Sequence, residues 1–153
     1  MGRFINKSRN ESKMKPSAHF LSSLILALSL IPVLKWNALL VLAGGFLIDI
    51  DHYFWYVYKY RKINIFDSYK FFIKPMNEKS FGSVMGILLI FHTVEFLMVM
   101  LALSYLSKLA LIFTIGLLLH YALDLLYLYF VAQRFVVNHS IIYWLYKEKI
   151  QKL

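Results

Sequence analysis

Apolar residues occur in four long runs that are separated by polar segments. The runs cover residues of about 18–34, 38–57, 81–106 and 109–132. An apolar run of about 20 residues has the length of a helix that crosses a bilayer. Only a few residues separate the first run from the second and the third from the fourth, so neighbouring helices should be antiparallel. The pattern predicts an all-α integral membrane protein, an antiparallel four-helix bundle whose four spans fill residues 17–134.

The polar segments outside these runs differ in character. Residues 1–16 are basic without periodicity, which predicts a cytoplasmic tail. The loop at 59–79 interleaves aromatic residues with lysines. This pattern predicts either a short amphipathic segment on the inner leaflet or a solvated loop. Residues 135–153 carry an aromatic stretch that ends in lysines, which predicts an interfacial amphipathic helix. A cleaved signal peptide in the first run is disfavoured, because no cleavage motif follows Pro32.

Composition agrees with a location in a membrane. Of the 153 residues, 60% are hydrophobic and 18% are aromatic, which is more than an ordinary soluble fold uses. Cysteine is absent. Disulfides and thiolate ligands are therefore excluded, and any metal must be bound through nitrogen and oxygen.

Basic residues are unevenly placed along the chain. The formal net charge is +9, and of the 17 Lys and Arg residues only Lys35 and Lys108 lie in the turns after the first and third runs. This asymmetry is that of the positive-inside rule, which places both termini in the cytoplasm. We therefore expect a multi-pass protein of the inner (cytoplasmic) membrane. Its basic residues should contact anionic membrane lipid and not nucleic acid.

Acidic and imidazole side chains are concentrated in the apolar runs, although each acid near mid-membrane costs about 2.5 to 3.5 kcal/mol. Four of the eight acids and four of the five histidines lie within or at the edge of a run. They are Asp49, Asp51, Glu95, Asp124, His19, His52, His92 and His120. Because no Lys or Arg lies inside the runs to neutralise them, the carboxylates should gather around a cation.

Helical spacing pairs these groups. Side chains three or four residues apart share a helix face, and such pairs are Asp49 with His52, His92 with Glu95, and His120 with Asp124. Successive helix residues point about 100° apart, so Asp51 is a weaker candidate for a direct metal ligand than its neighbours. We assign it, together with Glu95, to catalysis. The predicted metal ligands are His19, Asp49, His52, His92, His120 and Asp124.

The donor types suggest the chemistry. Four carboxylates among neutral histidines carry a formal charge of about −4, which two divalent ions would balance. Mixed imidazole and carboxylate ligands suit zinc, manganese or iron. The hypothesis is hydrolysis of a lipid or phosphoester at the cytoplasmic leaflet, with metal-activated water and Glu95 as general base.

Three motifs resemble those of a known family, the YdjM-like inner-membrane metal-dependent hydrolases: His19, Ile48 through His52, and His120 with Asp124. The family's second motif reads P-D-I-D-H, and Ile48 stands here at the proline. Its H-R-G-x-T-H-S motif has no full counterpart, and the stretch 91–96 stands in for the second half. The resemblance covers about residues 18–130 and implies a membrane hydrolase whose substrate class is unassigned.

Three other functions would use the same groups. A transporter or channel would pass protons or metal ions, although the outer halves of the spans carry almost no acids. A haem protein would use His92 and His120 as axial ligands. A non-catalytic scaffold would use the polar pairs as hydrogen bonds between helices.

Overall fold

The computed structural model of the protein describes residues 16–78, 86–132 and 139–150. Every regular element in these ranges is helical, which confirms the all-α class. The longer helices are α1 (Pro16–Leu34), α2 (Leu39–Phe46), α3 (Ile50–Tyr60), α4 (Ile65–Glu78), α5 (Val94–Leu106), α6 (Lys108–Tyr127) and α7 (Ile141–Ile150). The short elements are the 3-10 helices η1 (Lys35–Ala38), η2 (Leu47–Asp49) and η4 (Ile90–His92) and the π-helix η5 (Leu128–Ala132).

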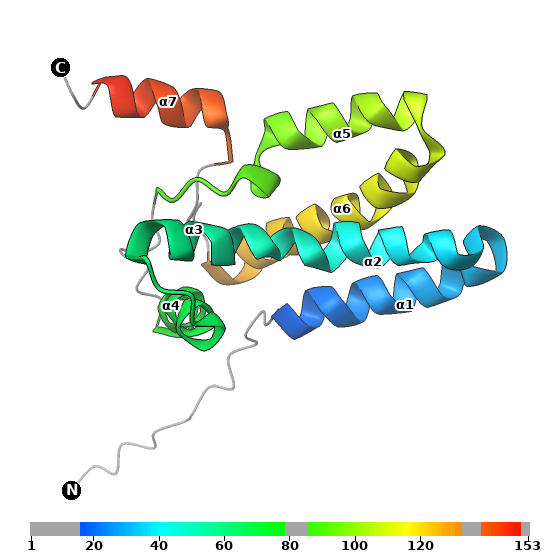
Figure 1. Ribbon diagram of the computed structural model, residues 1–153, viewed down its shortest axis with the longest axis horizontal. Helices are drawn as coiled ribbons and strands as arrows, with labels where there is room; N and C mark the ends of the chain where they lie inside the picture. The colour runs from blue at the N-terminus through cyan, green and yellow to red at the C-terminus, as the bar shows by residue number, and fades with distance from the viewer. Residues whose placement is uncertain (1–15, 79–85, 133–138, 151–153) are drawn as a thin grey trace, which may run out of the picture.

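Two antiparallel hairpins form most of the molecule (Figure 1). In the first, α1 ends at η1, where Lys35 has a left-handed φ of 53°, α2 returns along α1, and α3 extends beyond the start of α1. In the second, α5 ends at Ser107, whose side chain accepts a hydrogen bond from the backbone N–H of Ala110 and caps α6. The turns of both hairpins lie at one end of the molecule. Helices α4 and α7 lie towards the other end.

Glycines let α2 and α6 cross in backbone contact. A Cβ on Gly44 would overlap the carbonyl oxygen of Phe113, and a Cβ on Gly116 would overlap that of Val41. Any side chain larger than hydrogen would push the two helices apart. The close crossing matters for the site, because Asp49 and His52 follow Gly45 in η2 and α3, and His120 follows Gly116 in α6.

The third apolar run is not one helix. We expected a continuous span over 81–106, but in the described part of that run α5 begins only at Val94. Thr93 has extended dihedral angles, and its side chain accepts a hydrogen bond from Phe96 N, so it caps α5. At 13 residues α5 is about 20 Å long, which is shorter than a bilayer core of about 30 Å.

Two helical stretches, Ser17–Tyr60 and Lys108–Phe130, are long and apolar enough to cross a membrane. The first is the hairpin that folds back at η1. Its apolar side chains are largely exposed, among them Leu21, Ile25, Leu28 and Val33 on α1. Helix α1 lies in the first apolar run, α6 lies in the fourth, and the second is divided among α2, η2 and α3. Four spans in a membrane and two cytoplasmic termini stay predictions.

The loop expected at 59–79 is mostly helix. In α4, Phe72 is buried against Tyr56 of α3, whereas Ile65 and Phe66 are exposed. The element is therefore an amphipathic helix that packs on α3. Helix α7 lies within the predicted range 135–153 and has no buried residue.

Candidate metal centre

Seven of the eight predicted polar residues converge at one place. They come from the first turn of α1 (His19), the end of η2 (Asp49), the first turn of α3 (Asp51 and His52), the end of η4 (His92) and α6 (His120 and Asp124). Four are buried, namely His19, Asp51, His92 and His120. The side chains of Asp49, His52 and Asp124 are 26%, 22% and 31% exposed. The carboxylates of Asp49 and Asp124 thus form part of the open side of the cluster.

Two carboxylate oxygens lie near the paired Nε2 atoms of His92 and His120. His92 Nε2 lies 3.1 Å from His120 Nε2 and 3.3 Å from Asp49 Oδ1. His120 Nε2 lies 3.6 Å from Asp49 Oδ1 and 3.3 Å from Asp124 Oδ2, and His92 Nε2 lies 3.9 Å from Asp124 Oδ2. Ligands at about 2.0 to 2.1 Å around a tetrahedral metal are about 3.3 to 3.4 Å apart. The donor set and its spacing therefore fit a divalent metal ion.

The proton positions of the two central histidines follow from their other nitrogens. His120 Nδ1 lies 2.9 Å from the carbonyl oxygen of Gly45, which can only accept, so Nδ1 carries a proton. Gly45 is the next-to-last residue of α2, where carbonyl groups lack partners inside the helix. His92 Nδ1 lies 3.0 Å from Asp51 Oδ2 and donates to it. In the neutral rings both Nε2 atoms then carry lone pairs.

Two lone pairs at 3.1 Å repel each other, so a cation must lie between them, either a shared proton or a metal ion. The oxygens of Asp49 and Asp124 face the same point, which suits a metal better than a single proton. The short distance leaves no room for a porphyrin plane between the nitrogens. The geometry therefore does not support the haem alternative.

Asp51 orients its neighbours. Its Oδ1 accepts from His52 Nδ1 at 2.9 Å, and its Oδ2 accepts from His92 Nδ1 and from the backbone N–H of Phe91, both at 3.0 Å. Carboxylates that hold metal-binding histidines by their second nitrogen are common around metal sites. With both oxygens engaged, Asp51 is not placed to take a proton from water, so the expected catalytic role becomes a positioning role.

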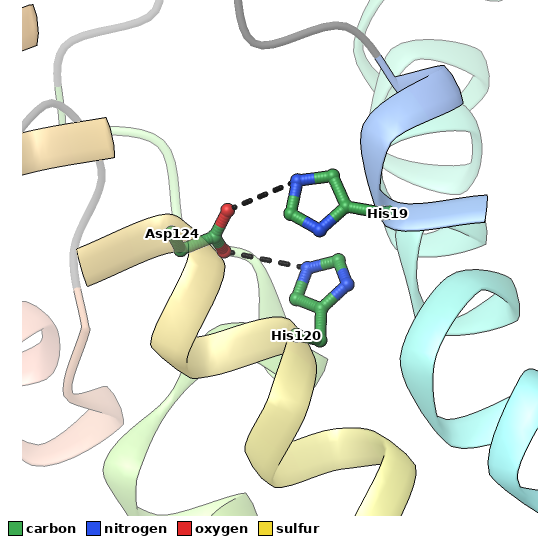
Figure 2. Close-up of side chains that lie close together, drawn as sticks. All are labelled: His19, His120 and Asp124. Carbon is green, nitrogen blue, oxygen red and sulfur yellow. Dashed lines mark ion pairs between the residues drawn. The ribbon is translucent and has the colours of Figure 1, made fainter. Parts of the chain in front are cut away.

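Asp124 faces two histidines at once (Figure 2). Its Oδ1 lies 3.4 Å from His19 Nε2, and its Oδ2 lies 3.3 Å from His120 Nε2. The two rings stack with centroids 4.1 Å apart and an angle of 26° between their planes. Figure 2 shows both rings on the same side of the carboxylate.

The ligand atoms also form three overlapping groups, each close enough to hold an ion: Asp49 with His92 and His120, His19 with His120 and Asp124, and Asp51 with His52 and His92.

Glu95 is not part of the cluster. Its carboxylate accepts hydrogen bonds from Ser140 Oγ at 2.6 Å and from the backbone N–H groups of Ile141 and Ile142 at 3.1 and 3.2 Å. It therefore caps the N-terminus of α7, where a negative charge is stabilised. The expected pairing with His92 assumed one helix through both residues. Because α5 begins at Val94, the spacing of three does not put them on one face.

Three contacts near His92 have no signal in the sequence pattern. The hydroxyl of Tyr121 lies 3.0 Å from the carbonyl oxygen of Phe91 and 2.8 Å from that of Thr93. His139 Nδ1 lies 3.4 Å from the carbonyl oxygen of His92. Burial lowers the pKa of His139. These side chains hold the η4 segment in place.

Comparisons of the chain with models of protein families, with curated proteins and with solved structures return no match.

Proposed function

We propose that the protein is a membrane-bound, metal-dependent hydrolase that acts on a lipid or phosphoester at the cytoplasmic leaflet. The observation that carries the proposal is the pair of Nε2 atoms of His92 and His120, 3.1 Å apart, with Asp49 Oδ1 at 3.3 and 3.6 Å. Three protein ligands with room for a further one are typical of catalytic zinc sites. Manganese or iron would suit the same donors.

A bound divalent ion would supply Lewis acidity and activate water for attack on an ester. The substrate would approach from the side of Asp49 and Asp124, since their carboxylates are the more exposed. We assign the general base to His52 in place of Glu95. Asp51 accepts a hydrogen bond from His52 Nδ1, which leaves Nε2 to exchange a proton with water or substrate.

The membrane location is supported by the two apolar helical stretches and their exposed apolar side chains, since large exposed apolar surfaces are rare on soluble monomers. The uneven placement of basic residues supports cytoplasmic termini. Membership of the YdjM-like family agrees with this function and remains part of the proposal, on the strength of the motifs at His19, at 48–52 and at His120.

Metal analysis of the protein purified in detergent tests the proposal. We expect at least one zinc, manganese or iron ion per chain, and loss of this ion in His120→Ala. Asp67→Asn, a change of an exposed carboxylate on α4, is the control and should keep the metal. Hydrolysis of a chromogenic phosphodiester should require the ion and stop on chelation. A parent protein that stays metal-free after incubation with each of the three metals would refute the proposal.

A further inference from the structure

We propose that the centre holds a second divalent ion, bound by His19 and Asp124 beside the first, and that the substrate is an anionic ester. This inference rests on the proposed function, because it adds an ion to the same site. The first ion takes His92, His120 and Asp49. It leaves two donors that face each other, His19 Nε2 and Asp124 Oδ1, at 3.4 Å.

The carboxylate of Asp124 is placed to bridge two ions. Its two oxygens face different imidazoles, Oδ2 towards His120 at 3.3 Å and Oδ1 towards His19 at 3.4 Å. A carboxylate that served one ion alone would not need to direct its oxygens at two separate nitrogens. In Figure 2 each oxygen faces its own ring.

Ring stacking sets the separation of the two positions. His19 and His120 lie nearly parallel with centroids 4.1 Å apart, and both direct Nε2 at Asp124. Ions bound by parallel rings in the same direction would be separated by about the stacking distance. Two-metal hydrolytic sites have separations of about 3.5 to 4 Å, so the stacking distance is close to what such a site requires.

The burial of His19 also calls for a partner. The residue is 6% exposed, and its Nδ1 has no hydrogen-bond partner in the described part of the chain. Burying an imidazole with one nitrogen unpaired is costly, and a structural role would need bonds on both sides. A cation at Nε2 would leave Nδ1 unpaired, but it would give the buried ring a strong interaction on the side that faces Asp124.

Charge indicates the substrate class. Asp49, Asp51 and Asp124 contribute a formal charge of −3 among neutral histidines, and no Lys or Arg is paired with them in the described ranges. One divalent ion would leave −1, which repels an anion, whereas two would give +1, which attracts one. A two-ion centre therefore favours a phosphoester over a neutral ester.

Titration of the full-length protein in detergent with Mn²⁺ tests the second ion. We expect two ions per chain and the electron paramagnetic resonance spectrum of a coupled pair. His19→Ala and the bulkier His19→Gln should bind one ion and show the hyperfine pattern of an isolated Mn²⁺. Ser23→Ala, one turn further along α1 and also buried, is the control and should bind two.

The outcomes separate the two proposals. One ion in the parent, with no change in the His19 variants, would overturn the second ion and leave the proposed function intact. No ion in the parent would overturn both. The coupled spectrum is measured on the parent, so the inference stays open to refutation even if a variant fails to fold.

Discussion

Replacing Gly116 by alanine should both separate α2 from α6 and disable the candidate metal centre. In an open helix this change stabilises by about 1 kcal/mol, because alanine is the better helix former. Here the added Cβ would lie 2.8 Å from the carbonyl carbon of Val41 and 2.9 Å from Gly45 N, and would overlap the oxygen of Val41. The neighbours are backbone atoms and cannot rotate away, so the clash outweighs the gain in helix propensity and the substitution destabilises the protein.

The size of the effect follows from these distances. An ordinary contact needs at least 3.4 Å, so the helices must separate by about 0.6 Å relative to the carbonyl carbon of Val41, and by more at its oxygen. Overpacking of this kind lowers the free energy of unfolding by about 1 to 3 kcal/mol. After the gain of about 1 kcal/mol from helix propensity, the net loss of stability is about 2 kcal/mol at the upper end. Metal ligands tolerate displacements of only about 0.2 Å, so the bond of 2.9 Å from His120 to Gly45 and the ligand spacing should both fail.

Thermal unfolding in detergent and metal content of the Gly116→Ala protein provide the assay. We expect a lower unfolding midpoint than in the parent and less than one ion per chain. Leu118→Ala removes an exposed side chain from the same helix and should change neither quantity much. If Gly116→Ala unfolds at or above the midpoint of the parent and keeps its metal, the close crossing does not hold His120 in place and the reasoning is refuted.

Three further variants separate positioning from catalysis. Asp51→Ala should weaken metal affinity about 10- to 100-fold in a competition titration, because His92 loses the acceptor at its Nδ1; unchanged affinity would contradict this role. His52→Gln should lower phosphodiester hydrolysis about 100-fold or more with full metal content, and a near-normal rate would remove His52 as the base. Glu95→Ala should release α7, seen as faster amide exchange at residues 141–142, with metal content and hydrolysis preserved; loss of hydrolysis with α7 still protected would restore Glu95 as a catalytic candidate.

Helical spacing predicted part of the site and failed where the helix was assumed. His120 and Asp124 lie four apart on a real helix, and they face each other at 3.3 Å. Asp49 and His52 span the junction of η2 and α3 and are 3.6 Å apart. Glu95 was misplaced, because Thr93 caps α5 just before it. A threonine inside an apolar run gave no reason to break the predicted helix there.

Contacts between distant segments could not be predicted from periodicity. The place of Asp51 depends on the backbone of Phe91, which is 40 residues away along the chain. The link from His120 to Gly45 spans 75 residues and uses a carbonyl group that every residue type carries. The all-α class, by contrast, followed from apolar run lengths alone, since those lengths depend on local sequence only.

The rings of His92 and His120 differ in how easily a substitution elsewhere in the chain can change their orientation. The ring of His120 is oriented by a main-chain oxygen, which persists whatever residue replaces its neighbours so long as the helices remain in contact. The ring of His92 relies on the side chain of Asp51, which a single nucleotide change can remove. Loss of the acid at 51 should therefore free the ring of His92 to turn, while the ring of His120 keeps its direction.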